Sequence, residues 1–290
     1  KEVSLAMPGY VMNLANSLIS SVLSERFEEI TMQADAPFAA AMAGYSELVK
    51  SKDAFQMVVV PKEGKELEGL NALLLEAEKM KRFGFTNAEL ERAKTNMLKN
   101  FEKSYNERDN QKSISLAREY IRHYLSNEPI PGIEFEYQTV QMILPQLKTE
   151  MINQLAKSYV SDTNVVISVM APEKANVKVP TESQILAAID ATQKAELTAK
   201  AEEVMNKPLL DKTPKAGKVK KIKQNPAMET TEMTLSNGVK LVFKPTTFKK
   251  DEITMRAFSD GGLSKVHNVA DLPSASMATG IVQANGIGNY

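Results

Sequence analysis

The feature that most constrains the fold is one change in the spacing of apolar residues, which occurs across a segment rich in lysine and proline. Before this segment, apolar residues recur every three or four positions, as in amphipathic helices. After it they alternate with polar residues, as in strands. Between Lys207 and Met228, three prolines and a run of lysines leave no period, so we predict a linker there.

The part before the linker is predicted to be rich in helices. Two boundaries carry explicit signals: Gly84 suits the position just past a helix, because glycine adopts positive φ cheaply, and Thr86 with Glu89 forms a capping box. The apolar spacing predicts helices at about residues 11–30, 67–83, 86–101, 113–125, up to 145, 149–159 and from 181 to before 208, and strands at 38–45, 54–60 and 164–171.

The part after the linker begins with a hairpin. Asn237-Gly238 is a strong turn signal between two alternating runs, residues 231–235 and 239–243. A third strand is predicted at Asp251–Phe258, and Asp271–Val282 opens a helix. The predicted fold class is therefore α/β (α+β), with a helix-rich domain at 1–205, a linker at 206–229 and the start of a second domain at 230–290.

Composition excludes several kinds of function. Lys plus Arg equals Asp plus Glu, so no overall charge favours nucleic acid or an anionic membrane as a partner. Cysteine is absent, which excludes disulfides, thiolate nucleophiles and Cys-zinc sites. No apolar run approaches the roughly 18 residues that span a bilayer. The lysine run from Lys212 to Lys223 lacks interleaved aromatics, so we interpret it as a solvated linker and keep phosphate contact as a weaker hypothesis.

No catalytic or metal site is predicted in this chain. A hydrolytic zinc needs three or four converging ligands, and the only histidines are His123 and His267, on opposite sides of the linker. Glu119 and His123 lie four apart and share a helix face, which is typical of an exposed face. Neither histidine has a nucleophile motif beside it.

Four stretches, in order, resemble the pitrilysin/insulinase family of zinc peptidases, the group with the inverted His-x-x-Glu-His motif. The most distinctive is FGFTNAELERAK at 83–94. The others are LSERFEEI at 23–30 with DAPF at 35–38, YIRHY at 120–124 with PIPGIE at 129–134, and LSNGVKL at 235–241 with KPT at 244–246 and GG at 261–262.

The resemblance implies homologous domains, each a mixed sheet backed by helices, whose two halves close around a substrate chamber. Residues 1–195 resemble the second domain, and residues from about Thr230 resemble the start of the third, an inactive copy of the first. In the active first domain two histidines bind zinc and the glutamate activates water. The positions matching that motif here are Ser274, Ala275, Ser276, Met277 and Ala278, so the resemblance implies no zinc ligand and no base.

We therefore expect a non-catalytic portion of a zinc metallopeptidase, inactive alone, that lines the chamber and helps bind an extended peptide, in part through a sheet edge. Zinc is expected only in the intact protein, whose partners would be a peptide or protein substrate and its remaining domains or a homologous subunit. The alternative is a scaffolding or core subunit of the same fold without peptidase activity. Lys1 is not an initiator methionine and residues 286–290 finish no element, so we expect a piece of a larger protein. The family favours the periplasm or cell envelope over the cytoplasm.

Overall fold

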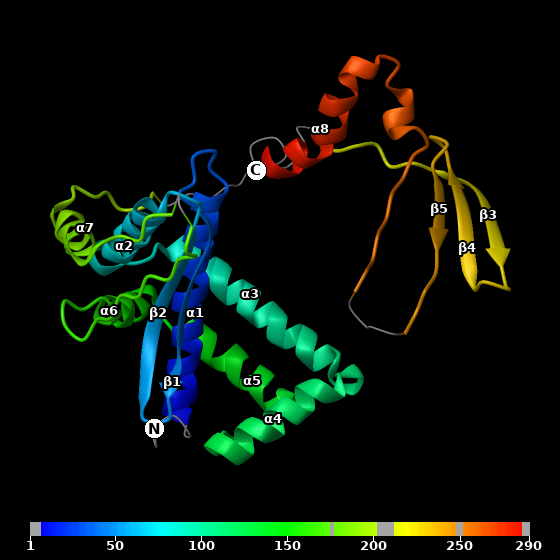
Figure 1. Cartoon of the computed structure of the whole chain (residues 1–290). Coiled ribbons are helices and arrows are strands. Elements are labelled where there is room, and N and C mark those ends of the chain that lie inside the picture. Colours follow the sequence, from blue (N-terminus) through cyan, green and yellow to red (C-terminus); the bar gives the residue numbers. More distant parts are fainter. Residues whose placement is uncertain (1–6, 175–176, 202–211, 248–251, 286–290) are drawn as a thin grey trace. The chain divides into compact units, whose positions relative to one another are not determined.

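The computed structural model describes residues 7–174, 177–201, 212–247 and 252–285. The chain divides into two compact units, one formed by residues 1–105 and 113–204 and the other by residues 106–112 and 205–290. Both units combine helices with antiparallel strands (Figure 1), so the α+β class predicted from the sequence is confirmed.

The first unit contains two long strands among helices. Its sheet, in the described residues, is the antiparallel pair β1–β2, with Ala43 opposite Met57 in the register. The elements are α1 (Met7–Thr31), β1 (Phe38–Val49), β2 (Lys52–Pro61), α2 (Glu66–Phe83), α3 (Asn87–Asn106), α4 (Ser113–Ser126), α5 (Ile133–Ile143), η3 (Leu144–Gln146), α6 (Thr149–Tyr159) and α7 (Glu182–Lys194). The helices predicted from apolar spacing and the first two strands are present, and helix α6 has the predicted bounds.

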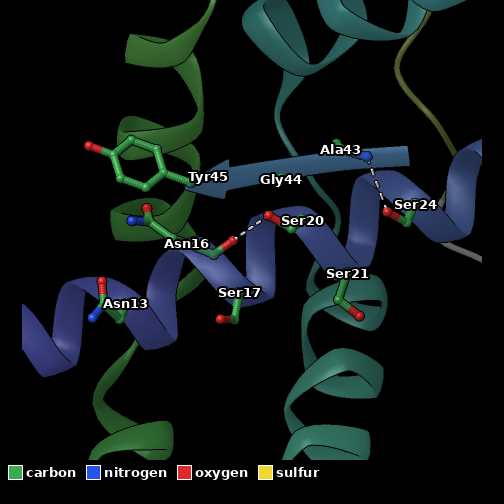
Figure 2. A pocket seen from close by; sticks show the side chains of 9 residues that line it. All are labelled: Asn13, Asn16, Ser17, Ser20, Ser21, Ser24, Ala43, Gly44 and Tyr45. Carbon is green, nitrogen blue, oxygen red and sulfur yellow. Dashed lines mark hydrogen bonds between the residues drawn. The ribbon is translucent and has the colours of Figure 1, made fainter. Parts of the chain in front are cut away.

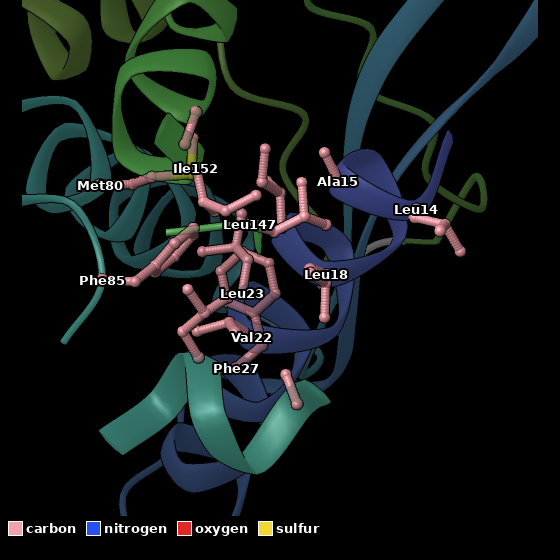
Figure 3. Close-up of a cluster of buried hydrophobic side chains, with 14 of the residues drawn as sticks. Leu14, Ala15, Leu18, Val22, Leu23, Phe27, Met80, Phe85, Leu147 and Ile152 are labelled. Carbon is pink, nitrogen blue, oxygen red and sulfur yellow. The ribbon is translucent and has the colours of Figure 1, made fainter. Parts of the chain in front are cut away.

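The core of this unit lies where α1 meets the hairpin and helices α2, α3 and α6. One face of α1 is apolar at helical spacing, and its Leu18, Val22 and Phe27 are fully buried (Figure 3). The ring of Phe27 contacts Phe38 of β1 edge to face, with centroids 6.3 Å apart. Partners from the other helices and from the connections between them include Met80, Phe85, Leu90, Leu147 and Ile152. Burial of this face fixes α1 against the inner side of the hairpin.

A buried ion pair joins α1 to the start of α3. Arg26 Nε and Nη2 donate to the two carboxylate oxygens of Glu89 at 2.7 and 2.8 Å, and both side chains are almost fully buried. Arg26 Nη2 also donates to the carbonyl of Gly84, and the guanidinium lies 5.0 Å from the ring centre of Phe85. Glu89 accepts from the backbone N–H of Thr86, and Thr86 Oγ1 accepts from the N–H of Glu89, as the predicted capping box requires.

The predicted strand at Asn164–Ala171 is wrong for this structure. These residues have no strand assignment, and Val166 is 93% exposed. An apolar, β-branched run forms a strand only where a neighbouring edge receives its backbone hydrogen bonds. In the described residues no strand pairs with it.

The second unit has an antiparallel sheet of order β3-β4-β5, followed by short helices. Its elements are β3 (Val219–Asn225), β4 (Thr230–Leu235), β5 (Lys240–Phe243), η4 (Gly262–Lys265), η5 (Val269–Asp271) and α8 (Leu272–Asn285); the turn η2 (Arg108–Asn110) is grouped with it. The predicted Asn237-Gly238 turn joins β4 to β5, with Gly238 at positive φ.

Two predictions for this unit need correction. Part of the predicted linker forms β3, because the lysines of this segment extend along an edge strand that pairs with β4. The predicted third strand is not formed in the described part of the chain: residues 252–258 have no strand assignment, no further strand adjoins them there, and Phe258 is 95% exposed. The first part of the predicted linker, residues 206–211, and residue 251 lie outside the described residues. The domain boundaries themselves stay a prediction.

Candidate functional site

A polar row runs along α1 beside its apolar face. Asn13, Ser17, Ser20 and Ser24 are spaced three or four residues apart, so they share one side of the helix. Together with β1 they line a cavity of about 580 Å³ (Figure 2). The burial of the apolar face therefore also fixes where the polar row lies.

The other wall of this groove is the edge of β1 that faces away from β2, with which no strand pairs in the described ranges. The backbone N–H of Ala43 points away from β2 and donates to Ser24 Oγ at 3.4 Å, a long hydrogen bond. Because backbone groups alternate between the two edges of a strand, Ala41 and Tyr45 also present their N–H and C=O groups to the side away from β2. A Cβ added at the intervening Gly44 would meet no atom within 4 Å. Among the described residues no strand pairs with this edge, and hydroxyl groups of α1 lie beside it.

Several polar groups of the groove make no hydrogen bond within the described part of the chain. Ser20 donates to the backbone carbonyl of Asn16 at 2.8 Å, and the side chain of Asn16 accepts from the Tyr159 hydroxyl. In the described part of the chain, the side chains of Asn13, Ser17 and Ser21 make no hydrogen bond. These three side chains leave donors and acceptors available beside the strand edge.

Stacked aromatic rings close one end of the groove. The ring of Tyr159, from α6, stacks on Tyr45 and on Phe55, with centroids 5.4 and 5.0 Å away. Burial, followed by the charge of nearby Tyr45, raises the pKa of Tyr159 to about 12, against the lowering effect of its bond to Asn16. Burial and then the charge of Asp53 raise the pKa of Tyr45. Both hydroxyls stay protonated near neutral pH, so this end of the groove is uncharged.

The lining of the groove is polar and uncharged near neutral pH. Apart from Tyr45, its lining contains no titratable side chain, so no serine has a base beside it to raise its nucleophilicity. Hydroxyl and amide groups beside a free strand edge match the alternating donors and acceptors of an extended peptide backbone. Sequence reasoning missed this site; the small polar residues at helical spacing in α1 were the signal that could have revealed it.

The positions predicted to replace the zinc motif lie on α8. Ser274, Met277 and Ala278 are all exposed there, as members of the helix predicted near residue 271. In the ranges that the structure describes, no group of three or more His, Cys, Asp or Glu side chains is placed to hold a metal ion. Whether the intact protein lacks a metal at these positions stays a prediction.

The two histidines lie in different units. His123 is exposed on α4, where its Nδ1 lies 2.7 Å from the carbonyl oxygen of Glu128, and His267 lies between η4 and η5. Glu119 is also on α4, whose side chains are largely solvent-exposed. Among the described residues, no helix is long and apolar enough to cross a membrane.

Comparison with known proteins finds relatives among zinc proteases. No family model matches the chain. A zinc protease PQQL-like protein of Arabidopsis thaliana is 27% identical over 278 residues, which is 96% of this chain and 26% of that protein. This similarity includes both units.

Two solved structures share the fold at low sequence identity. The periplasmic protease PqqL from Escherichia coli matches 81% of this chain with a TM-score of 0.58 and 18% identity. The ferredoxin protease FusC, solved in complex with Arabidopsis ferredoxin, matches 82% with a TM-score of 0.51 and 15% identity. The chain spans about a quarter of the length of each of these relatives.

Proposed function

From the confirmed resemblance of this chain to the pitrilysin/insulinase zinc peptidases, we propose that it is a non-catalytic portion of a zinc-dependent metalloendopeptidase that contributes to the peptide-binding chamber. The observation that carries the proposal is the similarity to a zinc protease over 96% of the chain. The structural neighbours PqqL and FusC support the same fold.

Within this function, the groove between α1 and β1 is proposed to bind substrate. An extended peptide would add to the free edge of β1 by backbone hydrogen bonds, and the polar row of α1 would bind its outer side. The long bond from Ala43 N to Ser24 Oγ is weak, so a peptide carbonyl replaces it at small cost. Because the groove recognises the backbone, it would accept peptides of varied sequence.

The zinc and the general base are proposed to come from another part of the longer protein. The positions of this chain that match the family's motif are Ser274, Met277 and Ala278, whose side chains supply neither imidazole nor carboxylate. This chain therefore contributes binding, and the hydrolytic water is activated elsewhere. We also propose the periplasm or cell envelope as its compartment, supported by the periplasmic neighbour PqqL.

The test compares the isolated chain with the longer protein, each supplied with zinc and a broad peptide library. The chain alone is expected to bind peptide without cleaving it, and the longer protein is expected to cleave. Stoichiometric zinc binding with turnover by the chain alone would overturn the proposal. A longer protein that binds neither zinc nor peptide, and that lacks His-x-x-Glu-His, would favour the scaffolding alternative.

A further inference from the structure

Residues 164–171 have the sequence of a buried strand but lie outside any sheet of the described structure. Val165, Val166, Ile167 and Val169 are β-branched, as in strands that are covered on both faces. Yet Val166 and Met170 are each 93% exposed. No backbone hydrogen bond joins this segment to a strand in the described part of the chain. So large an apolar exposure in one run marks a surface that another element covers.

Ion pairs and a hydrogen bond connect both ends of the segment to other parts of the first unit. Asp162 Oδ1 accepts from Lys81 Nζ at 3.0 Å, at the end of α2, and from Gln193 at 3.2 Å. At the other end, Lys174 Nζ lies 3.6 Å from the carboxylate of Glu63, just past the end of β2. The segment is thereby positioned on the same part of the unit as β2, although it does not pair with that strand.

In the described ranges, the outer edge of β2 also pairs with no strand. Ala43 directs its N–H away from β2, so its register partner Met57 directs its own backbone groups away from β1. By the same alternation, Phe55 and Val59 present their N–H and C=O groups to that outer edge. Among the described residues these groups have no strand to pair with. A two-stranded sheet with one buried face and an open edge is marginal without further strands.

We propose that residues 164–171 and the outer edge of β2 are parts of one larger sheet, completed by a strand from outside this chain. The occupant is an extended, apolar segment of the same longer polypeptide, because the relatives are about four times as long as the chain. This inference rests on the proposed function only in requiring a longer protein. It needs neither zinc nor peptidase activity.

Backbone hydrogen exchange tests the proposal in both the isolated chain and the longer protein. In the isolated chain, the amides of residues 164–171 are expected to exchange at nearly the rate of an unstructured peptide. In the longer protein they are expected to exchange at least 100-fold more slowly, together with those of Phe55, Met57 and Val59. Fast exchange in both proteins would show that the segment is a loop. Protection in the isolated chain at low concentration would show that the chain completes its own sheet.

A pair of substitutions gives an independent readout. Val166→Lys lies in the run, whereas Val179→Lys, the control, changes an exposed valine outside it. Neither is expected to shift the thermal midpoint of the isolated chain. In the longer protein, Val166→Lys is expected to lower the thermal midpoint by several degrees, whereas Val179→Lys is expected to leave the midpoint unchanged. Equal effects of the two substitutions in the longer protein would overturn the proposal.

The alternative occupant of the outer edge of β2 is a second copy of the chain. Sedimentation of the isolated chain over a range of concentrations distinguishes this case. We expect a monomer throughout, and association that protects residues 164–171 would overturn the assignment to another segment of the same polypeptide. If the longer protein lacks peptidase activity while the segment is protected, the proposed function fails and this inference stands.

Discussion

Glu89 is the residue through which three segments of the first unit are joined. It caps the start of α3, accepts two hydrogen bonds from Arg26 of α1, and lies 3.5 Å from the ammonium of Lys200. Burial alone would raise its pKa, but the hydrogen bonds from Arg26 and the Thr86 backbone, with the charges of Arg26 and Lys200, lower that pKa to about 2. Ionised Glu89 is therefore a stabilising group.

The lowered pKa of Glu89 predicts a loss of stability in acid. The unfolded chain takes up this proton near pH 4.5, so the contribution of about 3 kcal/mol is fully present above about pH 5 and is lost as the pH falls toward 2. Glu89→Gln is expected to lower the free energy of unfolding at pH 7 by roughly 2–4 kcal/mol and to flatten its pH dependence below pH 5. Urea unfolding at several pH values measures both.

The control for that measurement is Glu102→Gln. Glu102 is an exposed carboxylate on the same helix α3 that makes no ion pair among the described residues. Its loss is expected to change the free energy of unfolding by less than about 1 kcal/mol. Parallel pH curves for the unsubstituted protein and Glu89→Gln would contradict the assigned role of Glu89.

Substitution of Gly84 is also expected to lower the stability of the fold. The φ of Gly84 is +70°, and an added Cβ would lie 2.4 Å from Cγ of Asn153. The side-chain amide of Asn153 accepts a hydrogen bond from the N–H of Phe85 and donates one to its C=O. Gly84→Ala is therefore expected to cost about 3 kcal/mol or more, from backbone strain and from displacement of Asn153. Gly132→Ala, at φ +80° with no atom near, isolates the strain and is expected to cost only about 1 kcal/mol. Thermal or urea unfolding compares them, and equal losses would show that Asn153 moves aside freely.

These residues show which local features the sequence predicts. The capping box of Thr86 and Glu89 and the glycine at 84 are recognisable because each depends on neighbours within a few positions. The pairing of Glu89 with Arg26 joins residues 63 positions apart, so no local pattern indicates it.

At the scale of elements, apolar spacing predicted the helices well and the pairing of strands poorly. A helix satisfies its hydrogen bonds internally, so α6 could be placed from its own residues. A strand depends on its neighbour: β3 was hidden by its lysines, while residues 164–171 and 252–258 looked like strands and belong to no sheet among the described residues. The groove was missed for the same reason, because its second wall depends on the register of β1.

The groove predicts a change in peptide binding on substitution of α1. Ser17→Leu combined with Ser21→Leu places two bulky side chains in the cavity and removes two hydroxyls that make no hydrogen bond to the described residues. Because Ser17 is exposed and Ser21 half-buried, the fold should tolerate both. Binding of a fluorescently labelled extended peptide is expected to weaken at least 10-fold. Anisotropy titrations of the isolated chain measure it.

The matched control is Ser115→Leu, which makes the same serine-to-leucine replacement on the exposed helix α4. It should leave the affinity unchanged. A peptide that is N-methylated at alternate residues should also bind weakly, because it cannot donate to the edge of β1. Unchanged affinity for both the double variant and the methylated peptide would remove the groove from the proposed binding site.

At the scale of the whole molecule, the change in composition that predicts a linker lies close in sequence to the division of the chain into two compact units, and the predicted domain boundaries stay a prediction. What composition could not give is where the second sheet begins, because lysines that suit a linker also suit a solvated edge strand. The structure separates the lysines of this region into two groups. Lys212 and Lys215 are exposed and outside regular structure, whereas the lysines of β3 belong to a strand paired with β4.

Limited trypsin digestion of the chain should follow this division. Cleavage is expected first after Lys212 and Lys215, because proteases cut exposed, irregular chain readily, whereas a paired strand must open before it is cut. The lysines of β3 should be cut at least 10-fold more slowly, as measured by mass spectrometry over a time course. Lys212→Gln with Lys215→Gln should then prolong the lifetime of the intact chain. Early cleavage within β3 would show that this strand opens readily, and resistance at Lys212 and Lys215 would show that the connection between the units is packed.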